Sequence, residues 1–186
     1  MKKSLSLLVV LCVLFLSMAM SRSKGTRVDE RLFNGFALLI PMHTYIPVYN
    51  NPKKECQIDS VINDTIQENY VSITIYRIKD GMAEISVTYL LDSILGIFRP
   101  PAEGWMETKF LGTNLASYSD SIVKAYASPN RSSDVVFEIV YPHWGDWYPV
   151  KDASKGWLYI QNIYNASQCG WVAPEDQCNN PYTTCC

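Results

Sequence analysis

The densest group of chemically active side chains lies in the segment Tyr141–Pro149, where five aromatic side chains fall within eight residues. A small domain cannot bury so many rings in one loop, so we expect some of them to face solvent. Exposed rings rimmed by polar groups are typical of ligand-binding surfaces, because flat rings suit extended peptides, proline-rich chains and sugar faces. The expected ligand-binding residues are Tyr141, Trp144, Asp146, Trp147 and Tyr148, and Asp152 offers a further hydrogen-bonding carboxylate.

These rings have a second interpretation, in which Trp144 and Trp147 fill the contact between two halves of the chain. Solvent exposure discriminates between the two interpretations, since deep burial favours packing and exposure favours binding. Under the packing interpretation, the protein is a protein–protein scaffold or an accessory subunit of an envelope complex.

The sequence offers few combinations of residues that could act as a catalytic site. His43 and His143 are the only histidines, and a nucleophilic site needs a base held at hydrogen-bond distance from a thiol or hydroxyl. A hydrolase built on His143 and Asp146 is the rival hypothesis. The sequence contains no glycine-rich phosphate loop and no ligand set that suits a transition metal. We therefore expect no enzymatic activity, no cofactor and no metal site.

The cysteines indicate a redox environment rather than a metal site. Five of the six cysteines follow residue 21, and four of these five lie in the last 18 residues. Disulfides form in exported proteins, and a bridge there would tie down a tail that would otherwise fray. A zinc site is the alternative, but the spacing lacks a short Cys-x₂-Cys element. The disulfide candidates are Cys169, Cys178 and Cys185, with their pairing left open.

Residues 1–21 predict a secretory signal peptide. Lys2 and Lys3 give a positive start, Leu5–Leu16 is almost entirely apolar, and small residues follow at the positions that a signal peptidase reads. The apolar stretch is shorter than the about 20 residues of a membrane span. An uncleaved anchor and lipidation at Cys12 are the alternatives. We expect a periplasmic or extracellular mature protein with no membrane insertion after cleavage.

The charge of the mature chain argues against nucleic-acid binding. Without residues 1–21, which carry two lysines and no acid, 14 basic and 18 acidic residues remain, a net charge of −4. No cluster of Lys and Arg is present to neutralise phosphates. Nucleic acids and anionic membranes are therefore not expected partners.

Most of the mature chain shows the period-two alternation of β-strands. Apolar and polar residues alternate over 71–76, 82–89, 135–140 and 157–160, and β-branched and aromatic residues dominate. This alternation places one row of side chains on a core and the other toward water. Lys79-Asp80-Gly81 predicts a tight turn between the first two strands. No long amphipathic helix is visible, so the predicted fold class is all-β.

Two short signatures occur twice in the same order. Residues 46–52 and 122–129 each form an apolar strand that ends in Tyr, followed by two residues and Pro. Gly104-Trp105-Met106 resembles Gly170-Trp171-Val172. Repeated order predicts repeated structure, so we expect two tandem units of about 60 residues.

A strand of the form V-x-A-Y-x-x-P, then β-hairpins, then a closing Gly-Trp-hydrophobic element resembles the bacterial SH3-like (SH3b) domain. Over residues 38–186 the chain is similar to exported tandem SH3-like proteins of gut-type Gram-negative bacteria, in which a tail with Pro and Cys follows the last Gly-Trp. The resemblance implies two small, partly open barrels in tandem, with Trp105 and Trp171 of the closing strands in their cores. It divides the chain into a signal peptide (1–21), a linker (22–36) and two SH3-like domains (37–113 and 114–186).

The resemblance and the aromatic cluster together imply a non-enzymatic module of the cell envelope. The expected ligand is a peptide or a peptidoglycan-type chain that binds the aromatic surface of the second domain. The expected partners are accordingly cell-wall peptide, peptidoglycan or an envelope protein, and the sequence does not decide the oligomeric state.

Overall fold

The computed structural model describes residues 32–41, 43–63, 71–97, 102–116, 121–143 and 145–178. These residues belong to one compact unit, Leu32–Cys186. The predicted signal peptide (1–21) and most of the predicted linker (22–36) lie outside the described residues, so both stay predictions.

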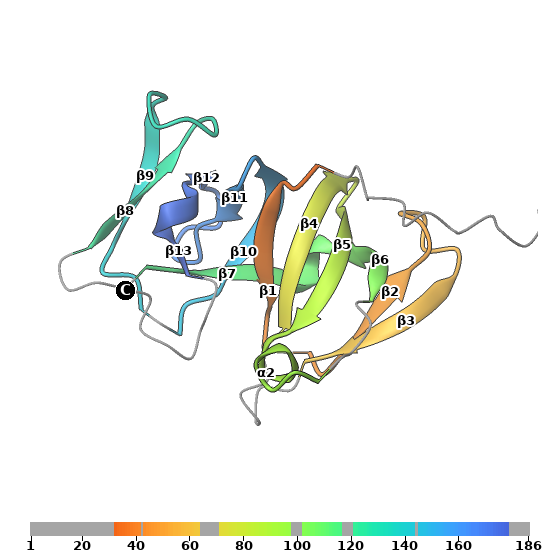
Figure 1. The fold of residues 1–186 in the computed structure, drawn as a ribbon. Coiled ribbons are helices and arrows are strands. Elements are labelled where there is room, and N and C mark those ends of the chain that lie inside the picture. Colours follow the sequence, from red (N-terminus) through yellow and green to blue (C-terminus); the bar gives the residue numbers. More distant parts are fainter. Residues whose placement is uncertain are drawn as a thin grey trace, which may run out of the picture. The chain divides into compact units, whose positions relative to one another are not determined.

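Strands dominate the described residues, which confirms the predicted all-β class (Figure 1). Helical structure there is limited to α2 (Leu90–Ile94) and two 3-10 turns, η1 (Thr108–Phe110) and η2 (Pro174–Asp176). The strands are β1 (Gly35–Leu39), β2 (Tyr45–Tyr49), β3 (Gln57–Ile62), β4 (Val71–Lys79), β5 (Met82–Tyr89), β6 (Glu103–Glu107), β7 (Leu111–Leu115), β8 (Ile122–Tyr126), β9 (Val135–Val140), β10 (Tyr148–Ser154), β11 (Trp157–Gln161), β12 (Cys169–Val172) and β13 (Gln177–Cys178).

The strand pattern follows the alternation of the sequence. In β11, Leu158 and Ile160 are fully buried, whereas the residues between and before them are half-buried on the opposite face. The predicted turn after β4 has Asp80 at a φ of +52° and Gly81 at +74°, as a two-residue hairpin turn requires. The hairpin between β10 and β11 turns in the same way, because its two central residues also have positive φ.

Antiparallel pairing joins the strands into one open sheet that runs through both halves of the chain. The order is β3-β2-β6-β5-β4-β1-β7-β10-β11-β12-β8-β9, and β13 pairs with β7 beside this path. In Figure 1 the orange β1 lies beside the yellow β4. The expected pair of separate barrels is not confirmed, because the sheet is continuous across β1 and β7. The predicted boundary between Thr113 and Asn114 falls inside β7.

The strand order is the same on both sides of the β1–β7 pair. Read outward from this centre, one side is β1-β4-β5-β6-β2-β3 and the other is β7-β10-β11-β12-β8-β9. Each strand therefore has a counterpart six strands later. The chain leaves η1 into β7, which pairs with β1, and leaves η2 into β13, which pairs with β7. We call residues 35–115 the first repeat and residues 111–178 the second repeat, so that β7 belongs to both.

Strand registers agree between the repeats at the two sequence signatures. Tyr49 of β2 pairs with Trp105 of β6. Tyr126 of β8 pairs with Trp171 of β12. The hairpins β4–β5 and β10–β11 each contain one register irregularity, and so do β2–β3 and β8–β9. The repeated signatures therefore occupy equivalent positions in the two repeats.

Glycine precedes each of these tryptophans because a neighbouring strand passes close by. A Cβ on Gly104, whose φ is +154°, would lie 2.6 Å from the backbone oxygen of Tyr49. A Cβ on Gly170 would lie 2.8 Å from the Cβ of Ala125. Both approaches are closer than van der Waals contact permits, so each Gly-Trp element needs glycine for packing against β2 or β8.

The inward rows of both repeats meet in one hydrophobic core. Its members are mostly Val, Ile and Leu, which suit the half-buried surface of a pleated sheet. The ring of Tyr148 lies within this core and is 0% exposed. One face of the sheet is thereby covered, and the alternate side chains of each strand point to the opposite face.

Candidate functional site

The structure separates the predicted aromatic cluster instead of presenting it as one surface. Tyr141 is exposed, with 56% of its surface accessible, and Trp147 is half-buried. Tyr148 is fully buried, so its ring packs in the core and offers no face to a ligand. Trp144 lies outside the described residues, and its exposure stays a prediction.

Asp146 serves as an internal acceptor. Its Oδ2 accepts hydrogen bonds from the Tyr164 hydroxyl at 2.6 Å and from the Tyr148 hydroxyl at 3.4 Å. The same oxygen accepts from the backbone N–H of His143 at 3.2 Å. Asn114 of β7 donates through Nδ2 to the backbone oxygen of Asp146 at 2.8 Å. These contacts order the loop before β10, which is a structural role for Asp146.

The two tyrosines that donate hydrogen bonds to Asp146 both have a raised pKa, but the main cause differs. Burial is the main cause that raises the pKa of Tyr148, and the charge of Asp146 adds to it. For the exposed Tyr164, the hydrogen bond to Asp146 raises the pKa. Because His143 contacts Asp146 through its backbone N–H, this contact does not orient the imidazole as a catalytic base. Both His43 and His143 are exposed.

A second group of rings lies on the solvent-facing side of the second repeat. Trp157 and Tyr159 stand on β11 and Trp171 stands on β12, all half-buried. The Tyr159 and Trp171 ring centroids are 5.2 Å apart, and the Trp157 ring meets the buried Tyr126 edge-on at 5.8 Å. We call Tyr126, Trp157, Tyr159 and Trp171 the aromatic face. A solvent-facing side of a sheet normally carries polar residues, so this grouping of rings is the candidate binding surface.

Sequence reasoning missed this face because the loop 141–148 has the higher density of rings. The alternation over 157–160 already placed Trp157 and Tyr159 toward water, and that placement is confirmed. Of the two tryptophans expected in the cores, Trp105 is buried at 6% exposure. Trp171 differs, since it is half-buried on the outer face.

Strand pairing places three of the four rings of the aromatic face in one row across four strands, together with a carboxylate. The row runs Asp152–Tyr159–Trp171–Tyr126, each residue paired with the next. The equivalent row of the first repeat runs Arg77–Glu84–Trp105–Tyr49. The two rows have the same backbone positions and a Tyr–Trp pair in common, but the other two side chains differ in charge and type.

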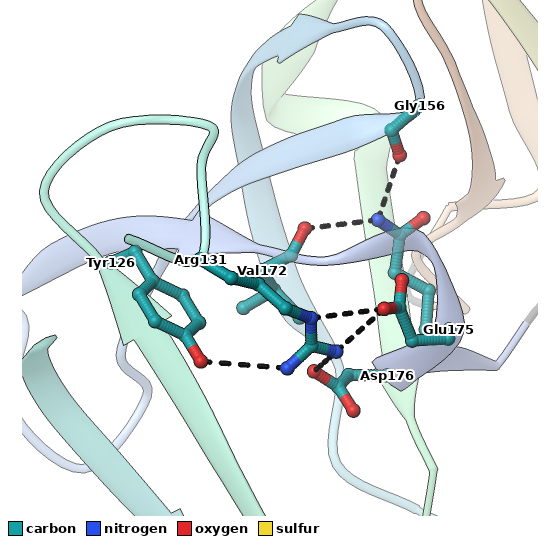
Figure 2. A network of polar contacts seen from close by, with 7 residues as sticks. Tyr126, Arg131, Gly156, Val172, Glu175 and Asp176 are labelled. Atoms are coloured by element: carbon teal, nitrogen blue, oxygen red, sulfur yellow. Dashed lines mark hydrogen bonds and ion pairs between the residues drawn. The ribbon is translucent and has the colours of Figure 1, made fainter. Parts of the chain in front are cut away.

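A polar network fixes the loop between β8 and β9 beside this face (Figure 2). Arg131 donates through Nε and Nη2 to Glu175 Oε1 at 3.0 and 2.7 Å, and through Nη2 to Asp176 Oδ2 at 3.1 Å. Its Nη1 lies 3.5 Å from the Tyr126 hydroxyl. Hydrogen bonds from the Glu175 backbone and from Arg131 lower the pKa of Glu175, whereas burial raises the pKa of Asp176. The network connects the loop to η2.

The cysteine prediction needs one correction. Cys169 is a free thiol in the structure, half-buried at the start of β12, so it is removed from the disulfide candidates. In the strand register, Cys169 of β12 pairs with Gln161 of β11. Cys178 is buried in β13. Cys185 lies outside the described residues, so a bridge between these two stays a prediction.

The described residues contain neither a cluster of metal-binding side chains nor a membrane-spanning helix. No group of three or more His, Cys, Asp or Glu in that part of the chain is placed to hold a metal ion. No helix within the same residues combines the length and apolar character needed to cross a membrane. Neither a protein-family model nor a curated protein sequence matches this chain.

Proposed function

We propose that this protein is a non-enzymatic binding module of the cell envelope, made of two tandem SH3-like units. The repeated strand order and the repeated Tyr–Trp pairing support the tandem arrangement. The second unit binds a peptide or peptidoglycan-type ligand, and the signal peptide directs the chain to the periplasm or outside the cell.

The observation that carries this proposal is the aromatic face. Its rings stand on regular strands, so their positions are held by the sheet and little entropy is lost when a ligand orders them. Trp157, Tyr159 and Trp171 are neither fully exposed nor fully buried, which suits rings that stack on a ligand. In this proposal the ligand surface lies on the sheet, and Tyr141 and Trp147 of the preceding loop are secondary contributors.

Co-sedimentation with purified peptidoglycan tests the proposal. Replacing Trp157 by Ala should weaken retention about tenfold, since a half-buried tryptophan in a binding surface is a typical hot spot. Tyr45→Ala is the matched control, because Tyr45 is 70% exposed on β2 of the first repeat. Trp147→Ala should have the smaller effect. Equal retention of the Trp157 variant and the wild type, with both folded, would contradict the proposal.

A second candidate, the protein–protein scaffold, is favoured by strand β9. This strand lies at one end of the sheet, and Val135, Val136 and Val140 are each at least 43% exposed. An apolar edge strand is suited to pairing with another strand. Val136→Lys should then abolish association in sedimentation velocity while leaving peptidoglycan retention intact. A monomeric wild type would exclude self-association by this edge.

The exported location also predicts an oxidised C-terminal region. With Cys56 and Cys169 free, a bridge from Cys178 to Cys185 would leave fewer than five titratable thiols in the mature protein. Thiol titration of the purified, unfolded protein under non-reducing conditions measures this number. Five free thiols would rule out the bridge.

A further inference from the structure

The two equivalent rows differ most at their first position. Arg77 opens the row of the first repeat, and Asp152 opens the row of the second. Both residues directly follow the register irregularity of their strand, so the backbone delivers the two side chains to the same place on the sheet. The two repeats therefore carry opposite charges at the same backbone position.

In the first repeat, a cation of the chain itself covers the tryptophan. The Arg77 guanidinium carbon lies 4.9 Å from the centroid of the Trp105 ring. The same guanidinium forms an ion pair with Glu84 through Nε at 2.6 Å. Arg77 thus satisfies both a ring face and a carboxylate, and Trp105 is left only 6% exposed.

In the second repeat, the tryptophan lacks this cover. Trp171 is half-buried, and Tyr159 stands where Glu84 stands in the first repeat. Asp152, exposed, takes the place of Arg77. Among the described residues, the two cations stacked on rings are Arg77 and Lys109, both in the first repeat.

We propose that the aromatic face binds a cationic side chain, a guanidinium or an ammonium group, of an extended peptide ligand. The ligand cation takes the place that Arg77 fills in the first repeat, stacks on Trp171 and Tyr159, and pairs with Asp152. This inference rests on the proposed function, because it assigns the chemistry of the ligand at the same site.

Charge complementarity supports this occupant. The row ends in a carboxylate at Asp152, and a cation desolvated between rings gains from a nearby carboxylate. The basic side chains of β8 and of the β8–β9 loop already have acidic partners, since Arg131 pairs with Glu175 at 2.7 Å and Lys124 pairs with Glu138 at 3.9 Å. Arg131 also contacts the Tyr126 hydroxyl through Nη1 at 3.5 Å, so it lies at the Tyr126 end of the row, and Asp152 lies at the other end.

Titration with matched peptides tests the inference. The probes are acetyl-Gly-Ala-X-Ala-Gly-amide with X as Arg, Lys, citrulline or norleucine, and the readout is the indole N–H signals of Trp157 and Trp171 in nitrogen-15 NMR spectra. The Arg and Lys peptides should bind about fivefold more tightly than the neutral peptides, in the range expected for cation–ring contacts. Equal affinity for Arg and citrulline would overturn the inference.

Two variants at one position complete the test. Asp152→Arg should supply an internal cation, as in the first repeat, and abolish binding of the Arg peptide. Asp152→Asn, which keeps the size of the side chain, should weaken binding of the Arg peptide only and leave the citrulline peptide unchanged. Unchanged binding of the Arg peptide to both variants would overturn the inference.

The outcome also separates this inference from the proposed function. If no peptide binds, or all bind equally, while peptidoglycan retention still depends on Trp157, the cation assignment is wrong and the proposed function stands. If no peptide binds and the wild type is not retained on peptidoglycan, both are wrong.

Discussion

The two repeats have one backbone plan and two different surfaces. In the first repeat, Arg77 closes the ring face of Trp105 from within the chain. In the second, Trp171 is half-buried beside Tyr159, and Asp152 lies at the end of the row. The difference teaches that the pattern of apolar inward positions defines the frame, while a few outward side chains decide whether a face is closed or available.

The loops β2–β3 and β8–β9, which are equivalent in the two repeats, also differ in their ion pairs. In the first, Lys54 pairs with Glu107 at 2.7 Å, just before η1. In the second, Arg131 pairs with Glu175 and Asp176 within η2. In both cases a loop cation pairs with an acid in or next to a 3-10 turn, but the planar fork of Arg131 engages two acids whereas Lys54 engages one.

The largest effect is expected from the glycines of the Gly-Trp elements. Gly104→Ala should lower the free energy of unfolding by about 3 kcal/mol, because the new Cβ strikes a backbone oxygen and the φ of +154° is strained. Gly170→Ala should cost about 1–2 kcal/mol, since its closest neighbour is a methyl group. Urea unfolding measures both. Equal costs would mean that the two elements are less different than their contacts indicate.

Alkaline pH should act on the second repeat through Tyr148. Burial raises the pKa of this phenol above its usual value of 10, so its contribution to stability is complete below pH 10 and is lost as the pH rises further. The urea midpoint of the wild type should therefore fall above pH 10. Tyr148→Phe should flatten that fall, whereas Tyr45→Phe, at an exposed position of β2, should not. The same pH profile in all three proteins would contradict the assignment.

A smaller effect is expected from the loop cations. Arg131→Ala should cost about 1 kcal/mol and Lys54→Ala about 0.5 kcal/mol, because exposed ion pairs contribute little and only the Arg131 fork reaches two acids. Thermal unfolding provides the comparison. A larger cost for Lys54 would reverse the interpretation of the two loops.

The smallest effect on stability should follow removal of the Arg77 cover. Arg77→Ala should cost about 0.5 kcal/mol, since the side chain is 62% exposed and its ion pair is screened by solvent. The fluorescence of Trp105 should nevertheless shift to the red as water reaches its ring. An unshifted spectrum would show that Arg77 does not shield this ring.

Local alternation predicted the strands well. The segments 71–76, 82–89, 135–140 and 157–160 all lie in strands, and the turn at Asp80-Gly81 has the expected backbone. Period-two burial is a local property that a sequence displays directly. The paired signatures around Tyr49 and Tyr126 also indicated equivalent positions correctly.

The surface was harder to predict, because it depends on which strands become neighbours. Nothing local states that Asp152, Tyr159 and Trp171 share one row, since these residues come from three strands. Likewise, the burial of Tyr148 follows from its place beside β7, not from the density of rings in its own segment. The continuity of the sheet across β1 and β7 is also a long-range pairing.

An exchange of the two rows tests the central claim most directly. The double variant Arg77→Asp/Glu84→Tyr gives the first repeat the open row, and Asp152→Arg/Tyr159→Glu gives the second repeat the closed one. In titrations with the Arg peptide, the first variant should show a new response of the Trp105 indole, and the second should lose the response of Trp171. A Trp171 response that persists in the second variant, with no Trp105 response in the first, would contradict the account.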